Sequence, residues 1–492
     1  MKPAPFDYLR ATSAAEALAA LHHAGADAHI LAGGQSLLPM LNMRLARPRL
    51  LIDIMQIPDW HHVTDDGQAL RIGAGVRQIT IERLPDLPRR QPLLAAILPH
   101  LGHTQTRTRG TMCGSVAHAD PSAELPLVLT TLRGTVHLRS HRQHRNVPAE
   151  AFFTGKMTTA RTDTEIIEAV SIPIARPDTG YAFQEVARRH GDFAIIACAA
   201  VATRATVRLA IGGVADRPSA IDLPADPAIF DDALNDFAWT LEARDDLHAT
   251  ARYRRELVRR LGRAVMQQAM QSRSRPQVPE MLAVPRSRMS GIARWVVQRT
   301  QHAAARQTKT DPGGPTPGER TDIRTADMAA DRRHQVRFTL NGHPVTVEVE
   351  PRTLLQDALR HGLGATGTHV GCEHGVCGAC TIQIDGEPAR SCIVLAVQTD
   401  GADLRTVEGL SPAADKLSTL QECFREFHGL QCGFCTPGIL MSLDAFLRTH
   451  PDASEDAIRT MLSGHLCRCT GYAPIIRAAL AAADRLRQAH DV

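Results

Sequence analysis

The chain has 492 residues, too many for one hydrophobic core, which predicts two to four domains. Its composition, 43% hydrophobic and 22% charged, is typical of a soluble globular protein, and no apolar run approaches the length of a transmembrane segment. The net charge of +4 does not indicate nucleic-acid binding, because no basic block is interleaved with aromatic residues, which make up only 4% of the chain. The N-terminus lacks the apolar stretch of a secretory signal, so we expect cytoplasmic residence.

The first 220 residues are predicted to mix helices and strands. A helix is expected over residues 13–24, with buried strands at 29–32 and 50–54. The first strand runs into Gly33-Gly34, a turn that lets backbone N–H groups approach a phosphate without a Cβ in the way. Alone this turn indicates nucleotide binding only weakly, because a plain tight turn has the same sequence.

A second loop, residues 108–121, is rich in small and hydroxyl side chains. Small residues leave room for a flat ligand, and Thr111 and Ser115 supply hydroxyl groups. We interpret His118 as an ordinary loop histidine and Cys198, which lies in an apolar run, as a buried core thiol.

The middle of the chain contains a strand at 207–214 that ends in Gly-Gly and an arginine-rich helix at 253–271. The helix has apolar residues at helical spacing, so its arginines are interpreted as a solvated face. Residues 285–333 change in composition to Pro, Gly and polar residues, which predicts a flexible linker.

After this segment, residues 336–349 predict a β-hairpin that turns at Asn341-Gly342, followed by a helix at 353–361. Three cysteines then follow with C-x4-C-x2-C spacing, and a fourth comes after a short strand; they are Cys372, Cys377, Cys380 and Cys392. This spacing is that of plant-type [2Fe–2S] clusters, with glycines that let backbone N–H groups reach the sulfurs. The alternative is a structural zinc site, although zinc ribbons usually present two short C-x2-C knuckles.

Residues 411–492 predict four helical segments, one of them with Thr436 as its N-cap and Pro437 as its first residue. Between the helices lie two cysteine pairs, Cys432-x2-Cys435 and Cys467-x-Cys469. On spacing alone these four cysteines suit zinc as well as iron. Cys423 remains outside both cysteine sets and is interpreted as structural.

Two groups of motifs together resemble the molybdenum hydroxylases, the family of xanthine dehydrogenase and carbon monoxide dehydrogenase. Residues 32–36 (AGGQS) and 109–121 (RGTMCGSVAHADP) closely resemble the FAD subunit of that family. Residues 431–438 (QCGFCTPG) and 467–472 (CRCTGY) match the hallmarks of its second [2Fe–2S] domain. The resemblance covers nearly the whole chain apart from the linker.

The resemblance implies an α+β multidomain protein with a two-lobed (PCMH-type) FAD module, a β-grasp plant-type ferredoxin domain and an all-α four-helix [2Fe–2S] domain. The expected boundaries are 1–178 for the FAD-binding domain, 179–284 for its second lobe, 285–333 for the linker, 334–410 for the ferredoxin-like domain and 411–492 for the helical domain. Because the linker is long, we expect docking against a partner to set the domain arrangement.

By resemblance, one set of residues binds cofactors and another binds metal. The cofactor set is Ala32, Gly33, Gly34, Gln35, Ser36, Leu37, Thr111, Met112, Cys113, Gly114, Ser115, Glu124 and Gln184 for FAD, with Gln431 against the pterin of a partner. The metal set is Cys372, Cys377, Cys380, Cys392, Cys432, Cys435, Cys467 and Cys469. Three members depart from the family pattern: Cys113 replaces a common Gly, Glu124 a common Asp, and Gln184 a Lys of some members. Cys113 would crowd the pyrophosphate if its backbone required a positive φ.

The implied function is electron transfer within an oxidoreductase. Electrons pass from a large molybdopterin-binding partner subunit through two [2Fe–2S] clusters to FAD and an external acceptor, which is NAD, a quinone or a cytochrome. The complex is expected to be a dimer of heterodimers, and no side chain of this chain is assigned a catalytic role. The alternatives are a free-standing flavin and iron–sulfur reductase and a non-enzymatic zinc scaffold.

Overall fold

The computed structural model describes residues 2–273, 333–413 and 415–490. The predicted linker, except for residue 333, and residues 274–284 of the predicted second lobe lie outside this range. Within the described part, buried apolar residues form four hydrophobic core clusters.

The N-terminal part begins with a small parallel sheet that positions the first glycine turn. Its strands β1 (Asp7–Arg10), β2 (Ala28–Leu31) and β3 (Leu50–Asp53) are arranged in the order β1-β3-β2. Helix α1 (Ala14–Ala24) connects the first two strands, and the Ser13 hydroxyl caps it by accepting a bond from the Glu16 amide. Helix α2 (Leu37–Asn42) starts directly after the Gly-Gly turn. The predicted helix and both strands are therefore present.

A five-stranded antiparallel sheet follows, in the order β4-β5-β10-β6-β7. Its strands are Val63–Asp65, Ala69–Gly73, Ile166–Pro173, Thr135–Arg139 and His144–Pro148, respectively. Short helices occupy the chain between β5 and β6: α3 (Gln78–Glu82), α4 (Leu87–Arg90), α5 (Pro92–Ile97), α6 (Thr104–Arg107), α7 (Met112–His118) and α8 (Glu124–Thr131). Between β7 and β10 lie α9 (Ala149–Phe152), β8 (Phe153–Gly155) and β9 (Thr158–Thr159).

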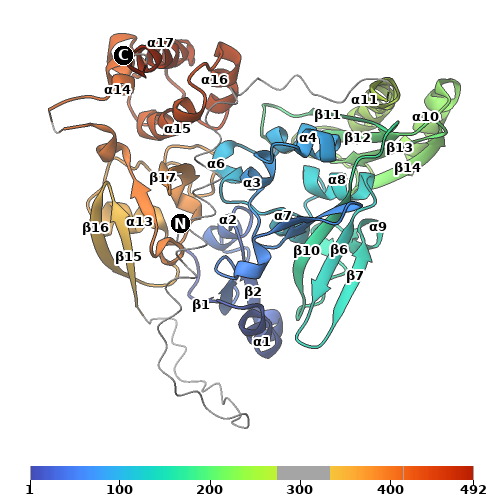
Figure 1. Cartoon of the computed structure of the whole chain (residues 1–492), viewed down its shortest axis with the longest axis horizontal. Coiled ribbons are helices and arrows are strands. Elements are labelled where there is room, and N and C mark those ends of the chain that lie inside the picture. The colour runs from blue at the N-terminus through green and yellow to red at the C-terminus, as the bar shows by residue number, and fades with distance from the viewer. Residues whose placement is uncertain (1, 274–332, 414, 491–492) are drawn as a thin grey trace, which may run out of the picture. The chain divides into compact units, whose positions relative to one another are not determined.

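The second lobe is an antiparallel meander covered by helices (Figure 1). Its strands are β11 (Gly180–Val186), β12 (Ile196–Ala202), β13 (Thr206–Gly212) and β14 (Ser219–Pro224). Helices α10 (Phe230–Thr240) and α11 (Ala251–Ser272) complete it, and α11 packs on β11, β12 and β13. The apolar stripe of α11 faces this sheet. Arg260 is exposed, but Arg254 is buried and donates to the carbonyls of Ile195 and Gly213, so the predicted solvated face does not include every arginine of the helix.

Residues 334–410 form a five-stranded mixed sheet in the order β16-β15-β19-β17-β18. The strands in chain order are β15 (His334–Leu340), β16 (His343–Val349), β17 (Thr381–Ile384), β18 (Glu387–Arg390) and β19 (Asp403–Arg405). The predicted helix at 353–361 is instead α13 (Leu355–Asp357) followed by a π turn at Ala358–Gly362. The C-terminal helices are α14 (Thr419–Glu426), α15 (Thr436–Thr449), α16 (Glu455–Leu462) and α17 (Ala473–His490). Helix α15 begins at Thr436, so Cys435 rather than Thr436 is its N-cap.

One of the four core clusters joins the N-terminal part to the ferredoxin-like part. It combines Phe6, Leu38 and Leu51 with Leu355 and Ile382, all nearly inaccessible to solvent. Burial of this apolar area stabilises the packing of the two parts within the chain itself. The expectation that a partner sets their arrangement is therefore not met for these two parts.

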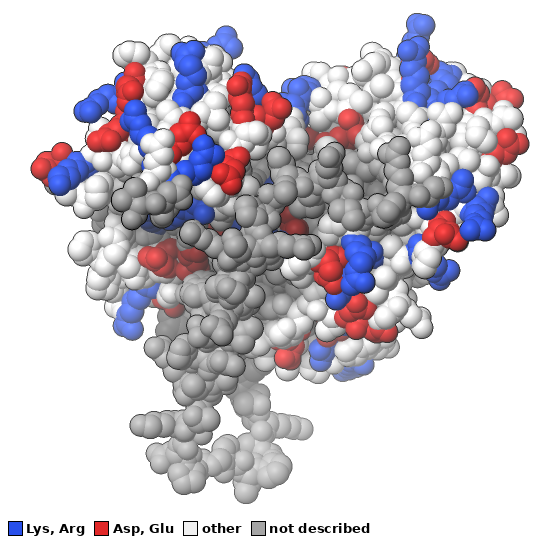
Figure 2. Space-filling view, turned by 45° about the horizontal axis from the view of Figure 1, so that its top comes forward, with Lys and Arg blue, Asp and Glu red and all other residues white. Residues whose placement is uncertain are grey.

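On the face shown in Figure 2, blue basic and red acidic side chains are interspersed over the described surface. They do not gather into a single basic field on that face.

Candidate functional site

A cavity of about 750 Å³ lies between the two predicted loops. Its volume is within the range of about 300–1,000 Å³ that small-molecule and cofactor sites occupy. Most of the predicted FAD residues line it: Ala32, Gly33, Gly34, Gln35, Ser36, Leu37, Thr111, Cys113, Gly114, Ser115 and Glu124. Met112 is fully buried in the core instead, and Gln184 is not part of the lining.

The two glycine loops touch each other at Gly33. A Cβ added there would lie 2.7 Å from the Cα of Gly110 and closer still to the carbonyl oxygen of Arg109. Both neighbours are backbone atoms that cannot rotate away, so only glycine fits. Gly34 has a φ of 75°, and the Gln35 amide donates to the Gly33 carbonyl at 2.9 Å. The glycine at position 33 thus allows the backbones of the two loops to pack against each other at the wall of the cavity.

The second loop becomes the start of α7. Thr111 caps this helix, since its hydroxyl accepts a bond from the Gly114 amide at 3.1 Å. Cys113 is helical and not among the residues with positive φ, and its thiol donates to the carbonyl of Ile72 at 3.6 Å. Burial raises the pKa of this thiol to about 12. Cys113 therefore packs into the core, and the crowding that a positive φ would cause does not arise.

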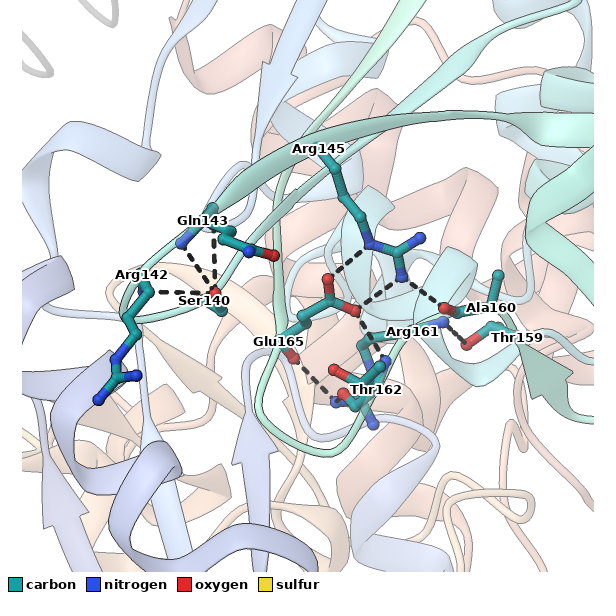
Figure 3. A network of polar contacts seen from close by, with 9 residues as sticks. All are labelled: Ser140, Arg142, Gln143, Arg145, Thr159, Ala160, Arg161, Thr162 and Glu165. Atoms are coloured by element: carbon teal, nitrogen blue, oxygen red, sulfur yellow. Dashed lines mark hydrogen bonds and ion pairs between the residues drawn. The ribbon is translucent and has the colours of Figure 1, made fainter.

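Arg161 and Glu165 border the cavity on the side of β2, where His29 also lines it. Figure 3 shows how this segment is held: Arg145 donates to both carboxylate oxygens of Glu165, at 2.6 and 2.8 Å. Arg161 donates to the Glu165 carbonyl at 2.8 Å. The bond from Arg145 is the main reason that the pKa of Glu165 is lowered. Sequence reasoning did not find these residues, because they form no recognisable motif.

Glu124 is a buried carboxyl group facing the cavity, 5% exposed. Burial and then the charge of Glu185 raise its pKa to about 8, so it is mainly protonated at neutral pH. Glu185 in turn contacts His100, with 3.0 Å between the carboxylate and Nδ1. Its neighbour Gln184 points to the other face of β11 and bonds Gln268 at 3.0 Å. The structure therefore brings Glu185, not Gln184, next to Glu124.

The first cysteine set forms a loop around converging sulfurs. Cys372 Sγ accepts backbone N–H bonds from Val376 at 3.3 Å and Cys377 at 3.4 Å. It is also within hydrogen-bonding reach of the sulfurs of Cys377 and Cys392, and Cys380 is within reach of Cys392. Backbone donors of this kind stabilise thiolate sulfur in iron–sulfur sites.

The loop of the first cysteine set adjoins the cavity. Its segment 374–376, together with Arg390 and Ile393, lines the same cavity as the glycine loops. The Asn42 amide at the end of α2 donates to the carbonyl oxygens of Glu373 at 2.6 Å and Cys392 at 3.0 Å. A helix that begins at the glycine turn thus also holds the cysteine loop.

The second cysteine set lies at the starts of α15 and α17. The sulfurs of Cys432 and Cys469 are 3.5 Å apart and both residues are exposed, whereas Cys435 and Cys467 are half-buried and within reach of each other. The Thr470 amide donates to the Cys467 sulfur at 3.5 Å. Exposed apolar side chains at Leu430, Phe434 and Leu466 surround this set, and Gln431 is exposed among them.

The segments that carry the two cysteine sets contact each other. The amide of Leu466, which precedes Cys467 of the second set, donates to the carbonyl of Cys377 of the first set at 3.0 Å. His369 Nδ1 bonds the Phe434 carbonyl at 2.9 Å. A Cβ on Gly438 would lie 3.0 Å from the Ala379 carbonyl oxygen, so α15 approaches the first loop as closely as glycine allows. A continuous protein path therefore runs from the second set through the first set to the cavity.

Within the described residues, no group of three or more His, Cys, Asp or Glu side chains is arranged to hold a single metal ion. A [2Fe–2S] cluster takes two cysteines on each of its two irons. The sulfurs of each set approach one another in pairs, which fits such a cluster, as the spacing predicts for the first set.

Four protein-family profiles match the chain. They are the FAD binding domain in molybdopterin dehydrogenase over residues 4–175, the CO dehydrogenase flavoprotein C-terminal domain over 181–269, the 2Fe-2S iron-sulfur cluster binding domain over 338–411 and the [2Fe-2S] binding domain over 406–480. These matches confirm the predicted fold class and the predicted cofactors of this chain, FAD and two [2Fe–2S] clusters.

Individual relatives resemble separate parts of the chain. The gamma subunit of caffeine dehydrogenase from Pseudomonas sp. (strain CBB1) is 60% identical over 149 residues, 30% of this chain and 88% of that subunit. The beta subunit of the same enzyme is 40% identical over 195 residues, 39% of this chain and 66% of that subunit. Quinoline 2-oxidoreductase from Pseudomonas putida 86 superposes with a TM-score of 0.52 at 32% identity, covering 56% of this chain and 99% of the other. Among the described helices, none is both long and apolar enough to cross a bilayer.

Proposed function

The chain belongs to the molybdenum hydroxylase family, and we propose that it carries electrons from a molybdopterin-binding partner subunit to an external acceptor. Cys432, Cys435, Cys467 and Cys469 would hold the cluster that receives the electrons, and Cys372, Cys377, Cys380 and Cys392 the cluster that passes them on. The cavity between the glycine loops would hold FAD. The observation that carries this proposal is that segment 374–376 of the first cysteine loop forms part of the wall of that cavity.

The residues of the chain have distinct tasks in this scheme. The Gly33-Gly34 turn and the start of α7 would bind the pyrophosphate, while Glu124 would lie at another part of the pocket, with Glu185 acting on it through its charge. A bound flavin supplies a carrier that takes electrons singly and stores two. The protonated Glu124 carboxyl can donate a hydrogen bond to an acceptor atom of such a ring. No side chain of this chain needs to act on the hydroxylated substrate.

Because the second cysteine set is exposed, it would be the point at which electrons enter this chain. Cys432 and Cys469 are at the surface, and Leu430, Phe434 and Leu466 form an apolar rim that a partner subunit would cover. Gln431 lies within this rim and would contact the pterin of the partner. The complete enzyme would be a cytoplasmic dimer of heterodimers.

We further infer an aromatic nitrogen heterocycle as the substrate class of the complete enzyme. The support is that relatives are named for caffeine, nicotine and quinoline. The substrate pocket itself would lie on the partner subunit. NAD, a quinone and a cytochrome are the acceptors to be compared in the assay.

The test is metal, sulfide and flavin analysis of the chain purified from its native host, alone and with any co-purifying subunit. The proposal expects about four irons, four labile sulfides and one FAD per chain, and a large molybdenum-containing partner. Cys435→Ser should lose half of the iron, while Cys423→Ala, a buried thiol of the same helical part outside both sets, should keep all of it. Zinc without sulfide would refute the proposal. Fast reduction of the chain by NAD(P)H without a partner would instead support a free-standing reductase.

A further inference from the structure

Arg390 is a buried cation at the junction of the cavity and both cysteine sets. It ends β18, is 4% exposed and lies two residues before Cys392. Its Nη2 donates to the carbonyl of Gly464 at 2.9 Å, while its Nε has no hydrogen-bond partner within the described chain. The side chain also lines the proposed flavin cavity.

The charged groups around Arg390 belong mainly to the first cysteine set. Burial lowers the pKa of the Arg390 guanidinium, and the cysteines of the first set, led by Cys380 and Cys392, oppose this shift. Arg390 also acts on two imidazoles, His103 before α6 and His465 in the helical part, whose pKa values fall to about 2 and about 3, chiefly through burial and then through the charge of Arg390 itself. Both imidazoles are therefore neutral at physiological pH and do not offset the guanidinium charge.

A buried guanidinium stays protonated, and its burial is costly unless a nearby anion compensates it. A [2Fe–2S] core held by four thiolates carries a net charge of about −2 when oxidised and about −3 when reduced. Because the attraction to Arg390 increases with the added electron, Arg390 favours the reduced state. The low polarity of the site strengthens this effect compared with a surface charge.

We propose that Arg390 sets the reduction potential of the cluster held by Cys372, Cys377, Cys380 and Cys392, raising it so that this cluster draws electrons from the second one. The proposal rests on the proposed function, since it assumes that these cysteines hold the cluster. The step is a transfer of one electron from one cluster to the other, with no proton and no bond change.

Arg468 provides the matched comparison. It lies between Cys467 and Cys469, so it is at least as close in sequence to its cysteine set as Arg390 is to its own. Arg468, however, is exposed, and solvent screens its charge. Removing Arg468 should therefore change the potential of its cluster much less.

The experiment uses the full chain with Arg390→Gln, Arg390→Lys and Arg468→Gln, and follows both clusters by EPR-monitored redox titration. Arg390→Gln should lower one of the two one-electron waves by at least about 59 mV, a tenfold change in the equilibrium constant. Arg390→Lys, which keeps the charge, should lower it by less than half as much, and Arg468→Gln should leave that wave in place. Iron and sulfide content of the unaltered chain tests the proposed function separately.

Several results would overturn the proposal. One is an Arg390→Gln protein with full iron content and both waves unchanged. Another is an equal shift in the Lys and Gln variants, because the bond to Gly464 rather than the charge would then be responsible. If Arg390→Gln fails to retain the first cluster, Arg390→Lys decides: full iron in the Lys variant supports a requirement for charge, and loss of iron in both shows a purely structural role.

Discussion

The bond between α2 and the cysteine loop allows a quantitative test through Asn42→Leu. Asn42 is 1% exposed, and its amide donates to the buried carbonyl of Cys392 and to the part-buried carbonyl of Glu373. Leaving one such group unpaired costs about 1–3 kcal/mol. The buried Oδ1 of Asn42 has no hydrogen-bond partner among the described residues. Removing this oxygen relieves its own desolvation cost and offsets part of the destabilisation. We expect a net loss of about 2–4 kcal/mol in the free energy of unfolding.

The assay is denaturant unfolding followed by visible absorbance, together with the rate at which a chelator removes iron. Asn42→Leu should release the iron of the first cysteine set faster, because that loop loses its anchor. Asn146→Leu is the control. The Asn146 side chain is exposed and contacts the His137 ring at 2.7 Å, so its replacement should stay within about 0.5 kcal/mol of the parent. Equal unfolding midpoints and equal iron release for parent and Asn42→Leu would refute the argument.

Three further predictions concern the cavity. Gly33→Ala should abolish FAD retention, because its Cβ would collide with the Arg109 backbone. Flavin content after gel filtration measures this retention. Gly155→Ala is the control and should keep its FAD, because a Cβ there has no neighbour closer than 3.9 Å. The pKa of Glu124 is raised to about 8, so the folded flavin-free protein holds a proton that the unfolded chain releases above about pH 4.5. The contribution of this group to the free energy of unfolding should therefore fall by about 1.4 kcal/mol per pH unit between about pH 4.5 and about pH 8. Glu124→Gln should flatten that part of the curve in urea unfolding, and an unchanged slope would contradict the assignment. Cys113→Gly should lower stability by about 1–3 kcal/mol through cavity formation yet leave FAD affinity, measured by titration, unchanged.

The sequence predicted features that depend on local patterns. Strand alternation at 336–349 and the Asn341-Gly342 turn each involve residues within one short segment, and the structure contains both. The difference at 353–361 is also local, because the segment closes with π rather than α hydrogen bonding. In β11, Gln184 was the residue predicted to bind FAD. Adjacent side chains of a strand point to opposite faces, so Gln184 contacts Gln268 while Glu185 contacts His100 on the other face.

The sequence could not predict contacts between distant segments. Asn42 and Cys392 are separated by 350 positions, and neither residue type signals the other. In sequence, Arg390 does not differ from any other arginine at the end of a strand, and its contact with Gly464 exists only in the folded chain. Arg161 and Glu165 likewise line the cavity together with His29 of β2, a contact between segments far apart in the sequence. Each of these residues is fixed by tertiary packing rather than by local propensity.

Exposure gives the proposed relay its direction. Cys380 and Cys392 are 2% and 1% exposed, and their loop adjoins the cavity, whereas Cys432 and Cys469 are open to solvent. Cys372 and Cys377 are half-buried, so the second set is the more exposed of the two, and under the proposed function electrons from a partner would enter at Cys432 and Cys469. The shared core of the N-terminal and ferredoxin-like parts and the anchor at Asn42 hold the first set against the cavity without help from the partner. Under the proposed function, a partner would therefore be needed to deliver electrons, while contacts within the chain would hold the first set beside the flavin.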